Sequence, residues 1–249
     1  MDKSMSSAMN DLALVRRLER GHLAVRTAQQ MAATLGLRPA SARVRLNRLV
    51  QRGVLARPAR GTYCLASADH LAVATGIYQP SYASLLAAFE HHGTTTQTAR
   101  VLDVINPVHS GTMVLHLESG GHRVRFIKVA GRLVFGYQRV FRQGMAATVA
   151  DREKAVVDTL LLPGHAPLDE AFACIRAGIE PQKAMDYARM TGRQAVMKRL
   201  GLLLSIAGLG PDAPMEVRLS GTYVPLDPSL PRRGKFDRCW RVIINRVIE

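Results

Sequence analysis

The stretch TAQQMAATLGLRPASARVRLNRLVQRG, residues 27–53, predicts two short helices joined by a tight turn. Thr27 is suited to begin the first helix, over 28–35, because a threonine hydroxyl can accept a hydrogen bond from the first-turn backbone. Pro39 falls in the first turn of the second helix, over 39–52, where a backbone N–H is not needed. A glycine follows each helix, as is typical of helix ends. The stretch therefore has the pattern of a helix-turn-helix.

The second of these helices divides its side chains between two faces. Ala42, Leu46 and Leu49 recur at helical spacing and, with Val50, are expected to face a core. The opposite face is polar and basic, as is typical of a helix that enters the major groove of DNA. The side chains expected on or beside that face are Ser41, Arg43, Val44, Arg45, Asn47, Arg48 and Gln51.

A further helix and a hairpin flank these two helices in the sequence. Residues 8–20 predict the helix, with Leu12 among the residues expected to face inward. The segments 54–57 and 62–65 predict two short strands, joined by a turn that contains proline and glycine. Three helices followed by a basic hairpin are typical of a winged helix-turn-helix, which we expect over residues 1–68.

Positive charge is concentrated in this segment. Residues 1–65 hold twelve Lys and Arg against three Asp and Glu, and eleven of the twelve cations are arginine. The whole chain has a formal net charge of +15 and a pI near 10.7, which predicts attraction to a polyanion. Arginine has a planar fork that suits phosphates and guanine edges, so its density favours double-stranded DNA over docking to a protein. The expected DNA contacts, the last two over flanking phosphates, are Thr27, Arg38, Ser41, Arg43, Arg45, Arg48, Arg57 and Arg60.

After a short connection at 66–76, residues 77–249 change period repeatedly and predict a second domain. Strands are expected over 101–105, 112–118, 122–129, 132–137, 215–224 and 239–247. Helices are expected over 82–92, 151–161, 168–177, 182–190 and 193–207. The expected fold class is therefore α+β, with an N-terminal winged helix-turn-helix followed by a mixed helix-and-sheet C-terminal domain.

The second part contains no residue pattern typical of a catalytic or metal site, and we expect neither an enzyme nor a bound cofactor. A restriction-type nuclease places an acid two residues before its lysine. Asp103 could supply the first acid of such a site, but Phe126 precedes Lys128 at the required position. One charged group is expected to form an ion pair on the surface of its helix. That group comprises Glu153, Lys154 and Asp158.

Two further features bear on the compartment. The N-terminus has no apolar segment typical of a secretion signal, and the most apolar run, Leu200–Leu209, is shorter than the about 20 residues that span a bilayer. The three cysteines are widely spaced and odd in number, so they indicate no disulfide framework. Each of them, Cys64, Cys174 and Cys239, is expected to be a small buried apolar residue. We therefore expect a cytoplasmic protein.

Short motifs are spread along nearly the whole chain. They are Arg60-Gly61-x-Tyr63, Pro80-Ser81-Tyr82-Ala83-Ser84, His92-Gly93-Thr94-Thr95-Thr96-Gln97, Arg152-Glu153-Lys154-Ala155-x-x-Asp158, Arg199-Leu200-Gly201, Leu226-Asp227-Pro228, Gly234, and Trp240-Arg241-Val242 running to Asn245. In their order and spacing after the expected winged helix, these motifs make the chain similar to the AbiEi type of transcriptional regulators. Members of that family are the antitoxins of type IV toxin–antitoxin and abortive-infection systems.

The resemblance implies a repressor of its own operon that binds promoter inverted repeats, as a homodimer or as two cooperating monomers. It also implies a C-terminal domain that counteracts a nucleotidyltransferase-like toxin without needing a stable complex with it. Arg199, Asp227 and Trp240 are the candidate residues for that antitoxin function. Their structural alternatives are an ion pair, a turn and a core position, respectively. Two other functions stay open: a DNA-targeted nuclease or modifying enzyme, and a ligand-sensing transcription factor.

Overall fold

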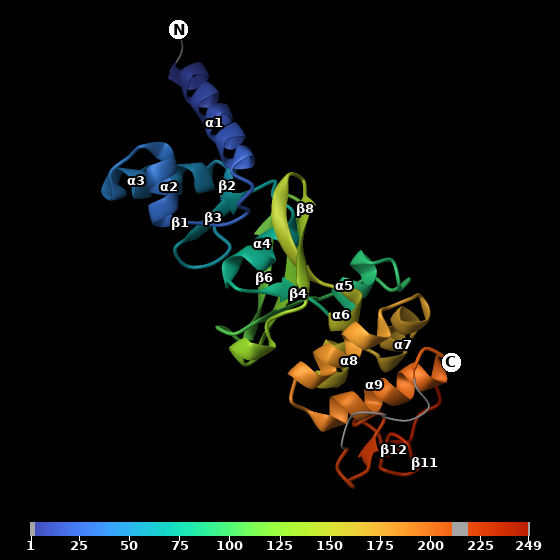
Figure 1. Cartoon of the computed structure of the whole chain (residues 1–249). Helices are drawn as coiled ribbons and strands as arrows, with labels where there is room; N and C mark the ends of the chain where they lie inside the picture. The colour runs from blue at the N-terminus through green and yellow to red at the C-terminus, as the bar shows by residue number, and fades with distance from the viewer. Residues whose placement is uncertain (1–2, 211–218, 249) are drawn as a thin grey trace. The chain divides into compact units, whose positions relative to one another are not determined.

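The computed structural model describes residues 3–210 and 219–248, with side chains from residue 11 onward, and divides the chain into two compact units (Figure 1). Unit 1 comprises Met1–Ala83, Val104–Val129 and Arg139–Val149, and unit 2 comprises Ser84–Asp103, Ala130–Gln138 and Ala150–Glu249. Both contain helices and strands, which confirms the predicted mixed class. The chain passes between the units several times, so they differ from the predicted domains 1–68 and 77–249, which stay a prediction.

Unit 1 begins with three helices and a small antiparallel sheet. The helices are α1 (Lys3–Arg20), α2 (Ala28–Leu35) and α3 (Pro39–Gln51). The strands are β1 (Arg26–Thr27), β2 (Leu55–Ala56) and β3 (Thr62–Leu65), in the order β1-β3-β2. Thr27 begins α2 as predicted, because its side chain accepts a hydrogen bond from the Gln30 backbone while the Gln30 side chain accepts one from the Thr27 backbone.

The core of these helices contains the predicted stripe of α3, formed by Ala42, Leu46 and Leu49. The prediction for α1 is wrong at Leu12, which is 52% exposed. Asp11 lies on the buried face of α1 instead, in register with the buried residues at 14 and 18. One residue turns an α-helix by about 100°, so Leu12 points away from the face that Asp11 occupies.

The rest of unit 1 contains most of a larger sheet and α4 (His70–Ile77), a helix that lies in the predicted connection at 66–76 except for its last residue. The strands of the sheet are β4 (Tyr82–Ala83), β5 (Leu102–Asn106), β6 (Gly111–Leu117), β7 (Gly120–Lys128), β8 (Tyr137–Arg142) and β9 (Met145–Ala150). Their order is β6-β7-β5-β4-β9-β8, with β4 antiparallel to β5 and parallel to β9. The β6–β7 hairpin pairs Gly111 with Phe126.

Two predicted elements around this sheet are wrong. The helix expected over 82–92 is strand β4 followed by the shorter helix α5 (Leu86–His91), because β4 pairs with β5 and Leu85 has a φ of 60° that no helix continues through. The strand expected over 132–137 is mostly a 3₁₀ turn, η1 (Gly131–Leu133), and β8 begins only at its last residue. Strand β9 follows β8 and was not predicted.

Unit 2 consists mainly of helices over a small sheet. Its helices are α5 together with α6 (Arg152–Leu161), α7 (Leu168–Arg176), α8 (Pro181–Met190) and α9 (Gln194–Ile206). The strands are β10 (Val224–Pro225), β11 (Lys235–Asp237) and β12 (Val242–Ile244), with β10 parallel and β11 antiparallel to β12. Of the strand predicted over 215–224, residues 215–218 fall outside the described residues, and of the described remainder only Val224 lies in a strand.

Helix α9 is the centre of unit 2, since every residue from Val196 to Leu204 is buried. Trp240 lies against it at Gly201, where an added Cβ would be 2.3 Å from the indole ring. The indole Nε1 donates a hydrogen bond to Ser205 Oγ at 3.0 Å. Glycine at position 201 is therefore what lets the tryptophan approach the helix. In the described residues, no helix is both long enough and apolar enough to cross a membrane.

Candidate nucleic-acid interface

The outer face of α3 is polar, basic and open to solvent. Because Ala42, Leu46 and Leu49 fix the roll of the helix by packing inward, the residues between them face outward. Of the predicted recognition face, the exposed members are Ser41, Arg43, Val44, Asn47, Arg48 and Gln51. Such a face presents hydrogen-bond donors, acceptors and one apolar side chain at the width of a single helix, which is what the major groove admits.

Arg45 differs from the other predicted contacts, because it is held against α1. Its Nη2 lies 2.5 Å from Asp11 Oδ1, and Arg52 Nη1 lies 2.6 Å from Asp11 Oδ2. The Asp11 side chain is buried, and this one carboxylate pairs with Arg45 of α3 and with Arg52, the residue just after α3, which ties the end of this helix to α1. The sequence reasoning missed Asp11, although its spacing from the buried residues of α1 is the signal that could have found it.

The loop between β2 and β3 presents two of the predicted arginines. Thr62 Oγ1 accepts a hydrogen bond from Ala59 N at 3.1 Å and donates one to Ala59 O at 3.0 Å, which fixes the loop. Gly61 has a φ of 76°, a conformation that side chains disfavour. Arg57 and Arg60 are exposed on this loop, and in the described part of the chain neither takes part in an ion pair.

Thr27 and Arg38 lie at the starts of α2 and α3. The Thr27 hydroxyl oxygen is used in the helix cap, and Ala28 N donates to Gly61 O at 2.9 Å, which places the start of α2 beside the β2–β3 loop. Arg38 precedes α3, makes no side-chain cap there and is exposed. The structure therefore brings Thr27 and the β2–β3 loop together and leaves the Arg38 guanidinium in solvent.

Not every arginine of the N-terminal segment is available for binding. Arg26 is buried, and its guanidinium donates to Leu18 O at 2.9 Å and Leu23 O at 2.8 Å. Burial lowers the pKa of Arg26, as expected when a cation leaves water. Arg26 therefore satisfies backbone carbonyls near the end of α1 rather than facing a ligand.

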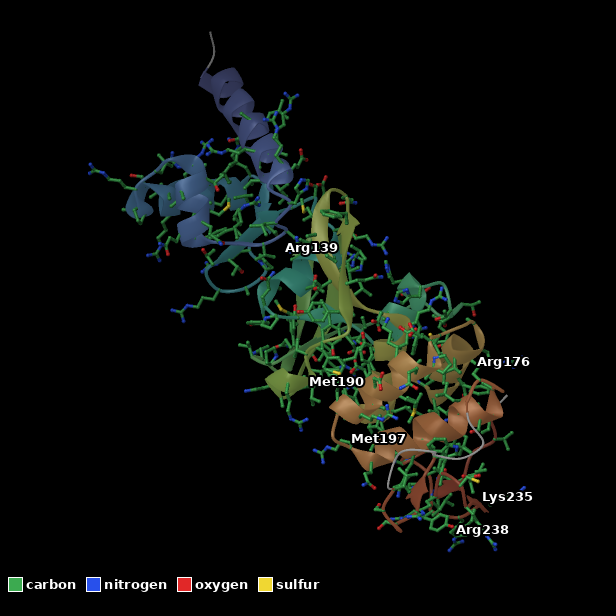
Figure 2. The ribbon with its side chains drawn as sticks, in the orientation of Figure 1. Arg139, Arg176, Met190, Met197, Lys235 and Arg238 are labelled. Carbon is green, nitrogen blue, oxygen red and sulfur yellow. The ribbon has the colours of Figure 1, made fainter. Side chains whose placement is uncertain are left out.

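Exposed cations also occur on other elements. Arg139 on β8, Lys235 on β11 and Arg238 just after β11 are exposed and labelled in Figure 2. Exposed positive charge alone therefore does not single out an interface. The distinguishing feature of α3 is that its exposed arginines share one helix face with Asn47, a side chain that can read base edges.

Two of the three candidate antitoxin residues, Arg199 and Asp227, lie at one pocket of unit 2. Asp227 Oδ1 accepts hydrogen bonds from the Ser229 backbone and hydroxyl, and Arg246 Nη1 lies 2.9 Å from Oδ2. Burial would raise the pKa of Asp227, but these partners outweigh it and lower that pKa. The third candidate, Trp240, does not line this pocket and is part of the core on α9.

The charged group of α6 contradicts the prediction of a surface ion pair. The side chains of Lys154 and Asp158 form an ion pair in which each is 1% exposed, and Glu153 is also buried. Ser84 Oγ donates to Asp158 Oδ2 at 2.8 Å. Glu153 accepts from Lys183 Nζ at 2.9 Å, and although burial raises its pKa, its hydrogen bonds lower it on balance. The spacing of the pair was correctly recognised, but α6 is covered on all sides.

The prediction that all three cysteines are buried is correct for two of them. Cys64 and Cys174 are buried as predicted, and burial raises the pKa of their thiols to about 12 and about 11. Cys239 is exposed, so the prediction is wrong for this residue, which lies in a surface turn after β11. Within the described ranges, no group of three or more His, Cys, Asp or Glu side chains is placed to hold a metal ion.

Comparison with known proteins establishes a likeness of fold. No model of a known protein family matches the sequence, and no curated protein matches it. A solved structure with a similar fold is that of the RV2827C protein from Mycobacterium tuberculosis, with a TM-score of 0.56. The two sequences are 15% identical, and the similarity covers 92% of this chain and 88% of that chain. Membership of the AbiEi-type family stays a prediction.

Proposed function

We propose that this chain is a cytoplasmic transcriptional regulator that binds double-stranded DNA sequence-specifically, and that α1–α3 with β1–β3 form a winged helix-turn-helix. The observation that carries the proposal is the sorting of arginines on α3. Arg45 and, just after α3, Arg52 are both paired with Asp11, whereas Arg43 and Arg48 are exposed and, in the described residues, have no carboxylate partner. The arginines that are left without an acid are therefore the ones on the outer, solvent-facing side of α3.

In the proposed complex, α3 lies in the major groove. Arg43, Asn47 and Arg48 contact base edges, and the exposed Val44 side chain can contact a thymine methyl group. Arg57 and Arg60, on the β2–β3 loop, neutralise flanking phosphates and set the register of the protein without reading sequence. Recognition of an inverted repeat requires two copies, either as a homodimer or as two monomers on adjacent half-sites.

The experiment is a binding measurement with the full chain and two DNA fragments of equal length. One is the DNA upstream of its own gene, and the other is a scrambled sequence, each at two salt concentrations. Tighter, salt-sensitive binding to the upstream fragment supports an autorepressor. Equal affinity for both fragments contradicts sequence-specific regulation, and an Arg189→Ala variant, which alters an exposed arginine of α8, is the matched control.

We also propose the antitoxin activity that the motif resemblance implies, directed at a nucleotidyltransferase-like toxin. The support is the order of the motifs along the chain, because the individual residues have structural roles: Arg199 bonds backbone carbonyls, and Trp240 packs on α9. Variants at these two positions would report folding as much as function. The test is therefore rescue of growth by the whole chain when the product of the neighbouring gene is expressed. Lack of rescue contradicts the antitoxin proposal but leaves DNA binding unaffected.

A further inference from the structure

A pocket of about 320 Å³ lies inside unit 2. The end of α6, the α6–α7 connection, the start of α7, the middle of α9 and the segments after β10 and β12 surround it. Its walls are partly apolar, from Leu160, Leu168 and Leu226, and partly polar, from Arg199 and Arg246 among others. The space corresponds to about ten water molecules, so it suits a small organic molecule rather than a macromolecule.

Arg199 is the buried cation of this pocket, with 8% of the residue exposed. Its Nε donates to Pro225 O at 2.9 Å and its Nη1 to Leu160 O at 3.4 Å. A guanidinium has five N–H groups, so these two bonds leave three donors for other partners. Both acceptors are neutral carbonyls, and no ion pair to Arg199 is present in the described residues.

The nearby carboxylates are already engaged. Asp227 binds Arg246 and Ser229, and Arg246 also pairs with Asp169. The positive charge of Arg246 is therefore balanced by two acids, whereas Arg199 is balanced by none at contact distance. Burial lowers the pKa of Arg199, and the charge of Asp227, which lines the same pocket, only partly opposes this effect. A buried cation without a counter-ion is unfavourable, and an anion in contact with it would remove that cost.

The start of α7 also borders the pocket. Pro167, the residue before the helix, makes no side-chain hydrogen bond to the first turn, and both Pro167 and Leu168 line the pocket. The first N–H groups of a helix have no partner within it and favour negative charge. Asp169 and Glu170 in this turn oppose that effect, but Asp169 is paired with Arg246.

We infer that this pocket binds a small organic anion, with a carboxylate or phosphate group on Arg199 and an apolar body against Leu160, Leu168 and Leu226. Arginine suits both groups, because its planar fork matches two oxygens at once. The inference stands apart from the proposed function, since the residues proposed to bind DNA belong to unit 1 and the pocket belongs to unit 2. Either can fail without the other.

The test uses the full chain and matched small probes in isothermal titration calorimetry. Benzoate and phenyl phosphate carry the two candidate groups, and benzamide is the neutral counterpart of benzoate. We expect at least one acid to bind saturably. Benzamide should bind at least about tenfold more weakly than that acid. The acid that binds more tightly shows whether the pocket prefers a carboxylate or a phosphate group. Absence of binding by both acids, or equal binding of benzoate and benzamide, overturns the inference.

Two variants locate the binding. Arg199→Met removes the cation, and Ala166→Trp fills the pocket without breaking a hydrogen bond of the described residues. Each variant is expected to lower the affinity for the acid by about tenfold or more. The variant Arg189→Met, a matched arginine change on the surface of α8, is expected to leave this affinity unchanged. Because Arg199→Met also loses two backbone contacts, circular dichroism checks its fold. Unchanged affinity in a folded Ala166→Trp variant overturns the assignment of the pocket.

Discussion

Two cations of unit 1 and two of unit 2 lie in opposite environments. In unit 1, Arg43 and Arg48 extend into solvent from α3, whereas in unit 2 Lys154 and Lys198 are buried. Lys198 Nζ donates to Ser220 O at 2.9 Å, to Ser220 Oγ at 3.1 Å and to Thr222 O at 2.5 Å. An exposed cation keeps its hydration and is free to exchange it for a phosphate, while a buried one must be satisfied within the fold. In these four residues, the cations of α3 are therefore available to a ligand, whereas the two lysines of unit 2 are used within the fold.

The largest expected effect is on the buried pair of α6. Lys154→Met leaves Asp158 as a buried charge without its cation, and we expect the free energy of unfolding to fall by about 3–5 kcal/mol. Urea denaturation of the full chain measures this change. The double variant Lys154→Met/Asp158→Leu should recover much of the loss, because it removes both charges from the interior.

The matched control for that prediction is a surface pair in the same unit. Arg189 pairs with Asp186 at 2.6 Å on α8, and their side chains are 37% and 51% exposed. Arg189→Met should change the free energy of unfolding by less than about 1 kcal/mol. If Lys154→Met and Arg189→Met lower the free energy of unfolding equally, the proposed difference between buried and exposed cations is contradicted.

The next largest effect concerns two arginines of the same helix. Arg43→Ala should weaken binding to the proposed operator by about 1–3 kcal/mol and relax specificity at one base pair, because it removes an exposed fork. Arg45→Ala should change operator affinity less, because its guanidinium is held on Asp11. Fluorescence anisotropy with labelled operator distinguishes the two variants. A greater loss for Arg45→Ala would mean that the Asp11 pair opens on DNA.

A smaller effect on stability is expected at Asp11 itself. Asp11→Ala frees Arg45 and Arg52, and since both arginines are partly exposed, we expect a loss of about 1–2 kcal/mol in unfolding free energy. Affinity for scrambled DNA should rise at low salt, because two more cations are available to phosphates. The measurements are urea denaturation and anisotropy on the same preparation. An affinity that falls while the fold is intact would show that Asp11 acts by positioning α3.

The pair α2–α3 could be predicted from the sequence because its signals are local. Thr27 and Pro39 mark helix starts through contacts with the next turn, and the stripe at 42, 46 and 49 records which face is buried. Strand β4 has no such signal. Tyr82 and Ala83 form a strand because Tyr82 lies opposite Ile105, a partner that only the folded sheet supplies.

In the candidate site, too, local features could be predicted from the sequence and long-range contacts could not. Helical spacing identified the outer face of α3, but it could not separate Arg43 from Arg45, since that difference depends on an acid more than thirty residues away on α1. In α6, the i,i+4 spacing of Lys154 and Asp158 is the same for a surface pair and a buried one. What buries this pair is the packing of other helices around α6, which a single helix pattern does not record.

The smallest expected effect is a change in DNA affinity at Arg60. It distinguishes phosphate contacts from base contacts among the exposed arginines of unit 1. Arg60 lies on the β2–β3 loop, beyond the reach of the groove-facing side chains of α3 in the proposed complex. Arg60→Ala should weaken operator and scrambled DNA alike, and it should reduce the slope of log affinity against log salt by about one. Anisotropy over a salt series measures that slope, with Arg139→Ala on β8 as a control for an exposed arginine elsewhere in unit 1. If the slope is unchanged while operator affinity alone falls, Arg60 reads sequence, and the β2–β3 loop rather than α3 carries part of the recognition.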